Sequence, residues 1–207
     1  MLTAILTFIP PAVLIVLLPG PDTLVVLRAL VRQGRVTAAR TVLGVLTGLS
    51  VWVTAASLGL AAVLKASETA YTVLRLTGAA YLLFIGVQSL RSRTVELPLD
   101  DTPATRRRSL LGSGYVAGLA TDLLNPKVGV FFVTFLPGFI PAHQSVAVVS
   151  FILGAIFIAL TAAYFVVMLG LATRVTSWMA NARIRKRLDR ATGGVLIAFG
   201  VRLATES

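Results

Sequence analysis

The sequence predicts an all-α, polytopic membrane protein with six transmembrane helices, arranged as two inverted three-helix repeats. Three observations lead to this fold class. Of the 207 residues, 57% are hydrophobic and 13% are charged, whereas about a quarter of a soluble domain is charged. No Asp, Glu, Lys or Arg occurs between Val128 and Thr173. Fifteen of the 19 Lys and Arg residues fall in alternate connections between apolar segments.

Six apolar segments are candidates for spans, since a transmembrane helix needs about 20 apolar residues. They are 2–27, 40–64, 69–90, 110–139, 144–172 and 189–205. The first segment lacks the basic region and the clear cleavage site of a signal peptide. We therefore expect it to be retained as the first span.

The basic residues predict the orientation in the membrane. They gather in the first, third and fifth connections, which six spans place on one side. The positive-inside rule makes that side cytoplasmic. We therefore expect a multi-pass protein of the bacterial cytoplasmic (inner) membrane with both termini outside. The formal net charge of +11 then indicates cytoplasmic loops beside the lipid bilayer and no nucleic-acid partner.

One polar loop, residues 94–109, separates residues 1–93 from residues 110–207, and each half holds three spans. Because three is an odd number, the halves must have opposite orientations, as in transporters built from inverted repeats. Two similarities between the halves support this arrangement. LLPGPD (17–22) corresponds to LLNPKV (123–128), and AAYLLFIGV (79–87) resembles GGVLIAFGV (193–201).

The first and fourth spans are expected to be broken. Pro19, Gly20 and Pro21 interrupt the first, and Pro126 interrupts the fourth, because proline removes a backbone donor and clashes with the preceding turn. A break exposed to lipid leaves polar groups unsatisfied. A simple packing kink is the alternative, but an adjacent ionisable residue favours a functional break.

Ionisable and polar residues accompany both breaks: Asp22 at the first, and Asp122, Asn125 and Lys127 at the second. Acids inside a membrane are costly and mark pathways or proton relays. The ends of broken helices offer free N–H and C=O groups, which attract an anion and a cation respectively. A zwitterion suits both, with Lys127 at its carboxylate and Asp22 or Asp122 at its ammonium group or carrying a coupling proton. Alternatively, Asp22 and Lys127 pair and join the halves.

Several motifs occur in order along nearly the whole chain. They are PGPD (19–22), G-x-x-x-G (44–48), GAAYLLFIG (78–86), LLNPK (123–127), FLPGF (135–139) and AFGVRL (198–203). With these motifs the chain resembles the lysine-exporter (LysE/RhtB-type) translocator family, which includes homoserine and threonine exporters. The resemblance implies six spans and export of amino acids or close derivatives by proton antiport.

The resemblance also places Pro19, Gly20, Pro21, Asn125, Pro126 and Lys127 in the family's two break motifs. Two residues depart from it. Asp122 stands where relatives typically have asparagine, and Gly138 stands where FLPQF would place glutamine. An additional acid at position 122 would favour a basic amino acid as substrate.

Other functions find less support in the residues. Catalysis is not expected, since the G-x-G-D signature of membrane aspartyl proteases is absent and the single histidine, His143, is a poor candidate base. No cofactor and no resident metal site are expected. A divalent metal-cation exporter is the main alternative, with Asp22, Asp122 and Asn125 as oxygen ligands. Two G-x-x-x-G patterns favour close helix packing within the chain, with a homodimer as the other possibility.

Overall fold

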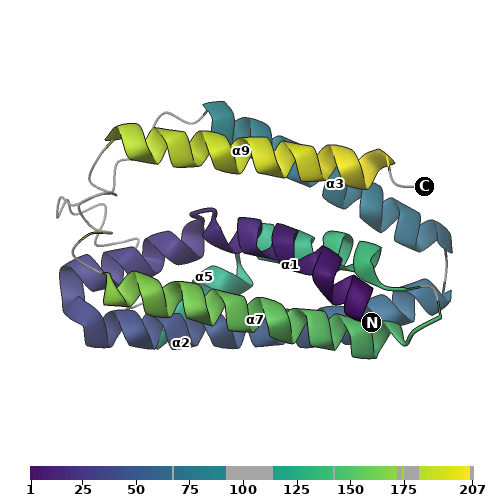
Figure 1. Cartoon of the computed structure of the whole chain (residues 1–207), viewed down its shortest axis with the longest axis horizontal. Helices are drawn as coiled ribbons and strands as arrows, with labels where there is room; N and C mark the ends of the chain where they lie inside the picture. Colours follow the sequence, from purple (N-terminus) through teal and green to yellow (C-terminus); the bar gives the residue numbers. More distant parts are fainter. Residues whose placement is uncertain (67, 92–113, 142, 172–173, 175–181, 206–207) are drawn as a thin grey trace.

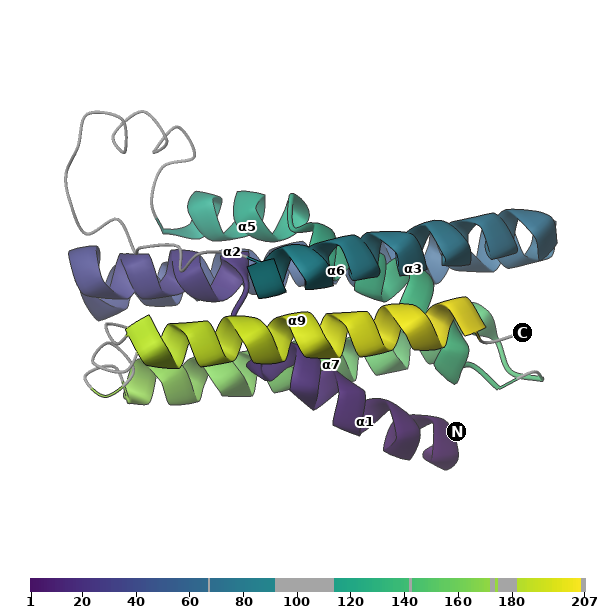
Figure 2. The ribbon, with the colours of Figure 1, turned by 90° about the horizontal axis from the view of Figure 1, so that it is seen from above.

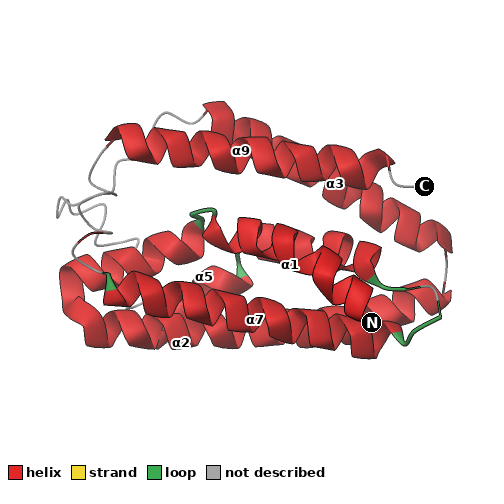
Figure 3. Ribbon diagram, viewed as in Figure 1, coloured by secondary structure: helices red, strands yellow, loops and turns green. Residues whose placement is uncertain are grey.

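The computed structural model describes residues 1–66, 68–91, 114–141, 143–171, 174 and 182–205, and all regular structure in them is helical (Figure 3). This confirms the all-α class. The helices are α1 (Leu2–Leu17), α2 (Pro21–Ala66), α3 (Glu68–Arg91), α5 (Tyr115–Leu123), α6 (Pro126–Val130), the π-helix η2 (Phe131–Phe135), the 3-10 helix η3 (Leu136–Phe139), α7 (Val146–Gly170) and α9 (Ala182–Thr205). The predicted loop 94–109 lies outside the described residues.

Helix α2 corrects the predicted boundary between the first two spans. We expected a connecting loop between positions 28 and 40, but this segment is helical on both sides of Gly34. Gly34 alone is non-helical, with φ 84° and ψ 179°, and the chain turns back there (Figure 1). The arginines around it do not end the helix, because arginine is a good helix former. A single glycine therefore makes the reversal.

Helices α3 and α9 form a close pair that lies above the other helices in Figure 1 and runs side by side in Figure 2. Glycines bring them together: a Cβ at Gly86 would lie 2.9 Å from the carbonyl oxygen of Gly193. Helix α9 begins at Ala182, seven residues before the predicted span. Several basic residues of the predicted fifth connection therefore lie in the first turns of this helix.

The two G-x-x-x-G patterns are used within the chain. Helix α5 lies on α2, where a Cβ at Gly44 would overlap the carbonyl oxygen of Tyr115 and a Cβ at Gly118 would overlap that of Thr41. Small residues let helix backbones approach this closely. The predicted use in internal packing is confirmed, and a homodimer stays a prediction.

A cluster of aromatic side chains fills the space where α1, η2, η3 and α7 meet. Phe131 is central, with its ring 4.7 Å from that of Phe157 and 6.0 Å from that of Phe8. Phe132 and Leu136 are fully buried beside it. Phe131 and Phe157 of this cluster also line a cavity beside the two helix breaks.

By length and composition, two helical stretches of the described residues contain a segment that can cross a membrane: Pro21–Gly59, which includes the reversal at Gly34, and Val146–Gly170. Tyr115–Leu123 and Lys127–Val133, inclined by 53°, would make a third if they form one bent span. Leu2–Leu17 and Leu76–Gln88 are shorter apolar helices. The six spans and the inverted repeat stay predictions.

Candidate functional site

The first break lies where the sequence predicts it. Helix α1 ends at Leu17, Leu18 has an extended backbone, and α2 begins at Pro21. Proline suits the first position of a helix, because its missing N–H would be unpaired there in any case. Asp22 follows in the first turn of α2, where the positive end of the helix dipole favours an acid.

The second break has the same local design. Helix α5 ends at Leu123, and Asn125 caps the next helix by accepting a hydrogen bond from the backbone nitrogen of Lys127 at 3.1 Å. Pro126 takes the first helical position. A π-helical turn, η2, follows directly, and such turns are frequent at functional sites. Both breaks therefore place a polar or charged side chain just after a helix-starting proline.

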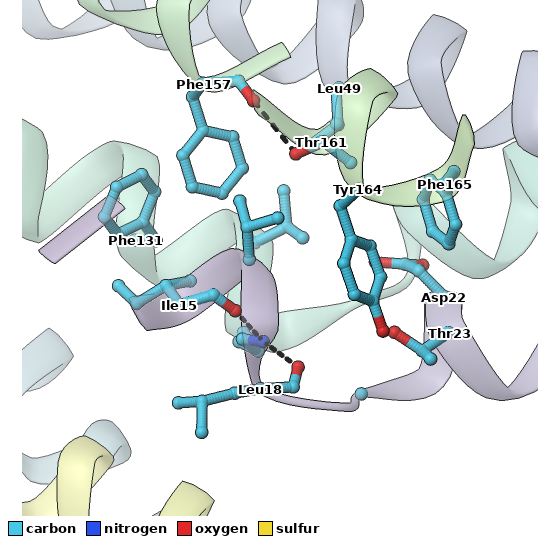
Figure 4. A pocket seen from close by; sticks show the side chains of 14 residues that line it. Ile15, Leu18, Asp22, Thr23, Leu49, Phe131, Phe157, Thr161, Tyr164 and Phe165 are labelled. Carbon is cyan, nitrogen blue, oxygen red and sulfur yellow. Dashed lines mark hydrogen bonds between the residues drawn. The ribbon is translucent and has the colours of Figure 1, made fainter. Parts of the chain in front are cut away.

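The two breaks meet in the structure. The Nδ2 atom of Asn125 donates to Oδ2 of Asp22 at 2.6 Å. The ammonium group of Lys127 donates to the carbonyl oxygens of Ile15 at 2.8 Å and Leu18 at 3.0 Å, drawn as dashed lines in Figure 4. A cation at these carbonyls satisfies the negative end of α1. Residues of the second break thus hydrogen-bond to both helices that flank the first break, at the end of α1 and at the start of α2.

A direct ion pair between Asp22 and Lys127 was the alternative that the sequence left open. In the described structure, Asp22 is instead joined to Asn125, and Lys127 to the end of α1. The second carboxylate oxygen of Asp22, Oδ1, is buried and has no hydrogen-bond partner. Asp22 therefore retains an unused acceptor.

A small cavity lies between the breaks and α7. It offers about 40 Å³ to the centres of water molecules, against roughly 10–15 Å³ needed for one water. Its lining residues are Ile15, Val16, Leu18, Gly20, Asp22, Thr23, Leu49, Lys127, Val128, Phe131, Phe157, Thr161, Tyr164 and Phe165. The cavity is too small for an amino acid without an outward movement of its walls.

Asp122 lies apart from this cavity. Its side chain is fully buried against α2, where a Cβ at Gly48 would lie 2.5 Å from its Oδ2 atom. Neither carboxylate oxygen has a hydrogen-bond partner. The indole nitrogen of Trp52 donates to its backbone carbonyl at 3.2 Å. Asp122 is not among the residues that line the cavity, so its expected place in the site stays a prediction.

Some of the other predicted site residues line the cavity, and the rest only border the helix breaks. Gly20, Asp22 and Lys127 line the cavity, and Asn125 touches it through its bond to Asp22. Pro19 and Pro21 border the break, and Pro126 is described here only by its backbone.

Sequence reasoning missed the polar residues that line the cavity together with Asp22, namely Thr23, Thr161 and Tyr164. Figure 4 shows the Tyr164 hydroxyl directed toward the hydroxyl of Thr23. The available signal was the spacing of Phe157, Thr161 and Phe165, which falls on one helix face.

The sequence is similar to known membrane proteins over nearly its whole length. The family model for the LysE type translocator matches residues 13–207. An uncharacterized membrane protein of Bacillus subtilis is 30% identical, covering 96% of this chain and 97% of its own. The homoserine/homoserine lactone efflux protein of Salmonella typhi is 29% identical, with 93% of this chain and 91% of the relative covered. The threonine efflux protein of Escherichia coli K12 is 27% identical, with 98% of each chain covered. No solved structure matches the chain.

Proposed function

Since this chain belongs to the LysE type translocator family, and is thus a membrane transporter and not an enzyme, we propose that it exports amino acids or close derivatives by proton antiport. Relatives over nearly their full length are named homoserine and threonine efflux proteins. Their names support an amino-acid substrate. The residues at the two breaks supply the chemistry by which one would be recognised.

One observation carries this proposal: a carboxylate and an ammonium group, Asp22 and Lys127, line the same cavity without pairing directly. An amino acid carries the complementary two charges. The ammonium group of the amino acid can donate a hydrogen bond to Oδ1 of Asp22, which has no partner in this state. The carboxylate of the amino acid can accept from the Lys127 ammonium group, which in this state donates to two neutral carbonyl oxygens. A bond between two ionised groups adds a Coulomb attraction that the bond to a neutral carbonyl lacks, which favours the exchange.

The same contacts suggest how binding is linked to movement. Asn125–Asp22 and Lys127–α1 are bonds between residues of the first and second halves. A zwitterion bound to Asp22 and Lys127 would replace the bond of Asp22 to Asn125 and the bonds of Lys127 to α1. These are bonds that hold the two halves together. The cavity must also widen to admit it. We therefore propose that substrate binding loosens this contact between the halves and permits the change from inward to outward access.

Proton antiport would follow from competition at one carboxylate. If Asp22 binds either the substrate ammonium group or a proton, the two ligands exclude each other. A cycle that changes access in both forms then moves them in opposite directions. The buried, unpartnered oxygen of Asp22 supports this assignment, because intramembrane acids of this kind serve as proton carriers.

For the architecture we propose two inverted repeats, residues 1–93 and 110–207, joined by the cytoplasmic loop 94–109. Reciprocal contacts support it. If the helix-starting prolines Pro21 and Pro126 correspond, a register one residue away from the alignment of 17–22 with 123–128, then Gly20 corresponds to Asn125 and Asp22 to Lys127. A Cβ at Gly20 would lie 3.7 Å from the Nζ atom of Lys127, and Asp22 contacts Asn125. A two-fold axis generates such exchanged pairs.

Helices α3 and α9 repeat this relation. If segment 79–87 corresponds to 193–201, then Ala79 corresponds to Gly193 and Gly86 to Gly200. The contact of Gly86 with Gly193 is matched by that of Gly200, whose Cβ would lie 3.0 Å from the carbonyl oxygen of Ala79. Six spans, basic loops in the cytoplasm of a bacterium and both termini outside the inner membrane complete the proposal.

Divalent metal export gains no support from the described residues. No three His, Cys, Asp or Glu side chains gather there, although hard cations need several oxygen ligands.

The experiment is efflux of labelled amino acids from proteoliposomes, with and without an imposed pH gradient. We expect gradient-stimulated efflux of amino acids by the wild type and its loss in Asp22→Asn, which keeps the size of the side chain. Gly59→Ala, at an open position of α2, is the matched control and should retain efflux. Folded protein that moves no amino acid would refute the proposal.

A further inference from the structure

The cavity has a third wall that neither Asp22 nor Lys127 provides. Helix α7 supplies it with Phe157, Thr161, Tyr164 and Phe165, and Phe131 and Leu49 close it. Figure 4 shows the Phe157 and Phe131 rings on the side of the cavity away from Asp22. A zwitterion held by Asp22 and Lys127 would place its side chain here.

The charges around the cavity decide which substrate side chains can lie against this wall. Of the residues that line the cavity, only Asp22 and Lys127 carry groups that are charged near neutral pH, and the amino-acid backbone uses both. A third charge on the substrate would lie among phenyl rings and hydroxyl groups without a counter-ion. A buried charge without a partner is strongly disfavoured. The wall therefore discriminates against charged side chains of either sign.

The additional acid of this chain does not change that balance. Asp122 is fully buried against Gly48 and does not line the cavity. Its carboxylate therefore makes no direct contact with a substrate side chain placed in the cavity. This argues against the basic substrate that Asp122 favoured at the level of the sequence.

Thr161 adds a polar contact to the wall. Its hydroxyl donates to the carbonyl oxygen of Phe157 at 2.9 Å, so the oxygen can still accept a hydrogen bond from a substrate hydroxyl. The Tyr164 hydroxyl is instead directed toward Thr23 (Figure 4). Thr161 is thus the residue of this wall with acceptor capacity for the substrate.

On these grounds, and resting on the proposed function, we infer that the transported amino acid has an uncharged side chain, which lies against α7, with Thr161 favouring a hydroxyl over a methyl group. The wall is then a specificity-determining surface separate from the pair of charges that holds the backbone of the substrate.

The test is exchange in proteoliposomes of labelled threonine, valine, lysine and glutamate, each measured against an excess of the same unlabelled amino acid. We expect threonine and valine to exchange at least tenfold faster than lysine and glutamate. Lysine or glutamate exchanging as fast as threonine would overturn the inference and leave the proposed exporter standing. No exchange of any amino acid would refute both.

Two variants locate the cause, each scored as a ratio of two substrates within one preparation so that the amount of folded protein cancels. Thr161→Val, which keeps the shape of the side chain, should lower the threonine-to-valine ratio about three- to tenfold, the effect of one hydrogen bond. Asp122→Asn should leave the neutral-to-lysine ratio unchanged. An unchanged threonine-to-valine ratio in the first, or a raised neutral-to-lysine ratio in the second, would overturn the assignment.

Discussion

The contact between α2 and α5 sets the position of the second break, and Gly118→Ala perturbs it directly. A Cβ at this position would overlap the carbonyl oxygen of Thr41, and would lie 2.9 Å from the carbonyl carbon of Thr41 and 3.0 Å from the amide nitrogen of Val45. All three are backbone atoms, which cannot rotate away. Helix α5 must therefore move as a whole.

The size of the effect follows from these distances. Non-bonded carbon atoms pack best at about 3.5–4.0 Å, so α5 has to shift by roughly an ångström. Overpacking of this kind costs about 1–3 kcal/mol. Because the obstacle is backbone, we expect the upper part of that range. The shift also moves Asp122, one helical turn further on, relative to Gly48.

The matched control is Gly59→Ala on α2, where no atom lies within 4 Å of the added Cβ. Alanine is favoured over glycine inside a helix by about 1 kcal/mol, so this variant should be as stable as the wild type or more so. The assay is thermal unfolding in detergent, followed by circular dichroism. A Gly118→Ala protein that melts with or above Gly59→Ala would refute the packing argument.

Three further predictions concern the turn and the site. Gly34→Ala should lower the melting temperature, because the positive φ of 84° costs a side chain about 1–3 kcal/mol, and an unchanged value would contradict the need for glycine there. Asn125→Ala should destabilise the protein by about 1 kcal/mol through the lost helix cap and also slow efflux, whereas Asn125→Asp should keep the cap yet lose efflux because it puts a second carboxylate beside Asp22. Lys127→Arg should reduce efflux at normal protein levels, because the planar guanidinium group cannot reproduce both bonds to α1; wild-type efflux would show that charge alone suffices.

Both helix breaks could be predicted from the sequence because their cause is local. Proline at positions 21 and 126 cannot continue a helix begun before it, whatever the surrounding structure. The internal use of Gly44 and Gly118 was predictable for a similar reason, since small residues at this spacing permit close helix contact.

The reversal at Gly34 and the α7 wall were harder to predict. Charged residues at positions 28–40 resemble a loop by composition, although they form good helices, and only the glycine distinguishes the turn. Thr161 and Tyr164 lie in an apolar helix, and the spacing that puts Thr161 on one face with Phe157 and Phe165 is equally typical of core packing. Their role depends on which helix faces the breaks, which is a matter of tertiary packing.

Asp122 illustrates a further limit. The sequence places it three residues before Asn125, in the same apolar stretch as Lys127. The helix geometry of α5 turns its side chain toward Gly48 instead of the cavity. In a helix, proximity in sequence does not by itself place two side chains on the same face.

The central claim, that an amino acid binds in the cavity between the two breaks, can be tested by protection of a single cysteine. The chain has no cysteine of its own, so Thr161→Cys in the cavity wall and Gln144→Cys in the exposed segment before α7 each carry one thiol. The rate of alkylation by a water-soluble maleimide is measured with and without threonine. We predict that threonine slows alkylation at position 161 in a concentration-dependent manner and leaves position 144 unaffected. Equal rates at position 161 with and without threonine, in protein that transports it, would contradict the account.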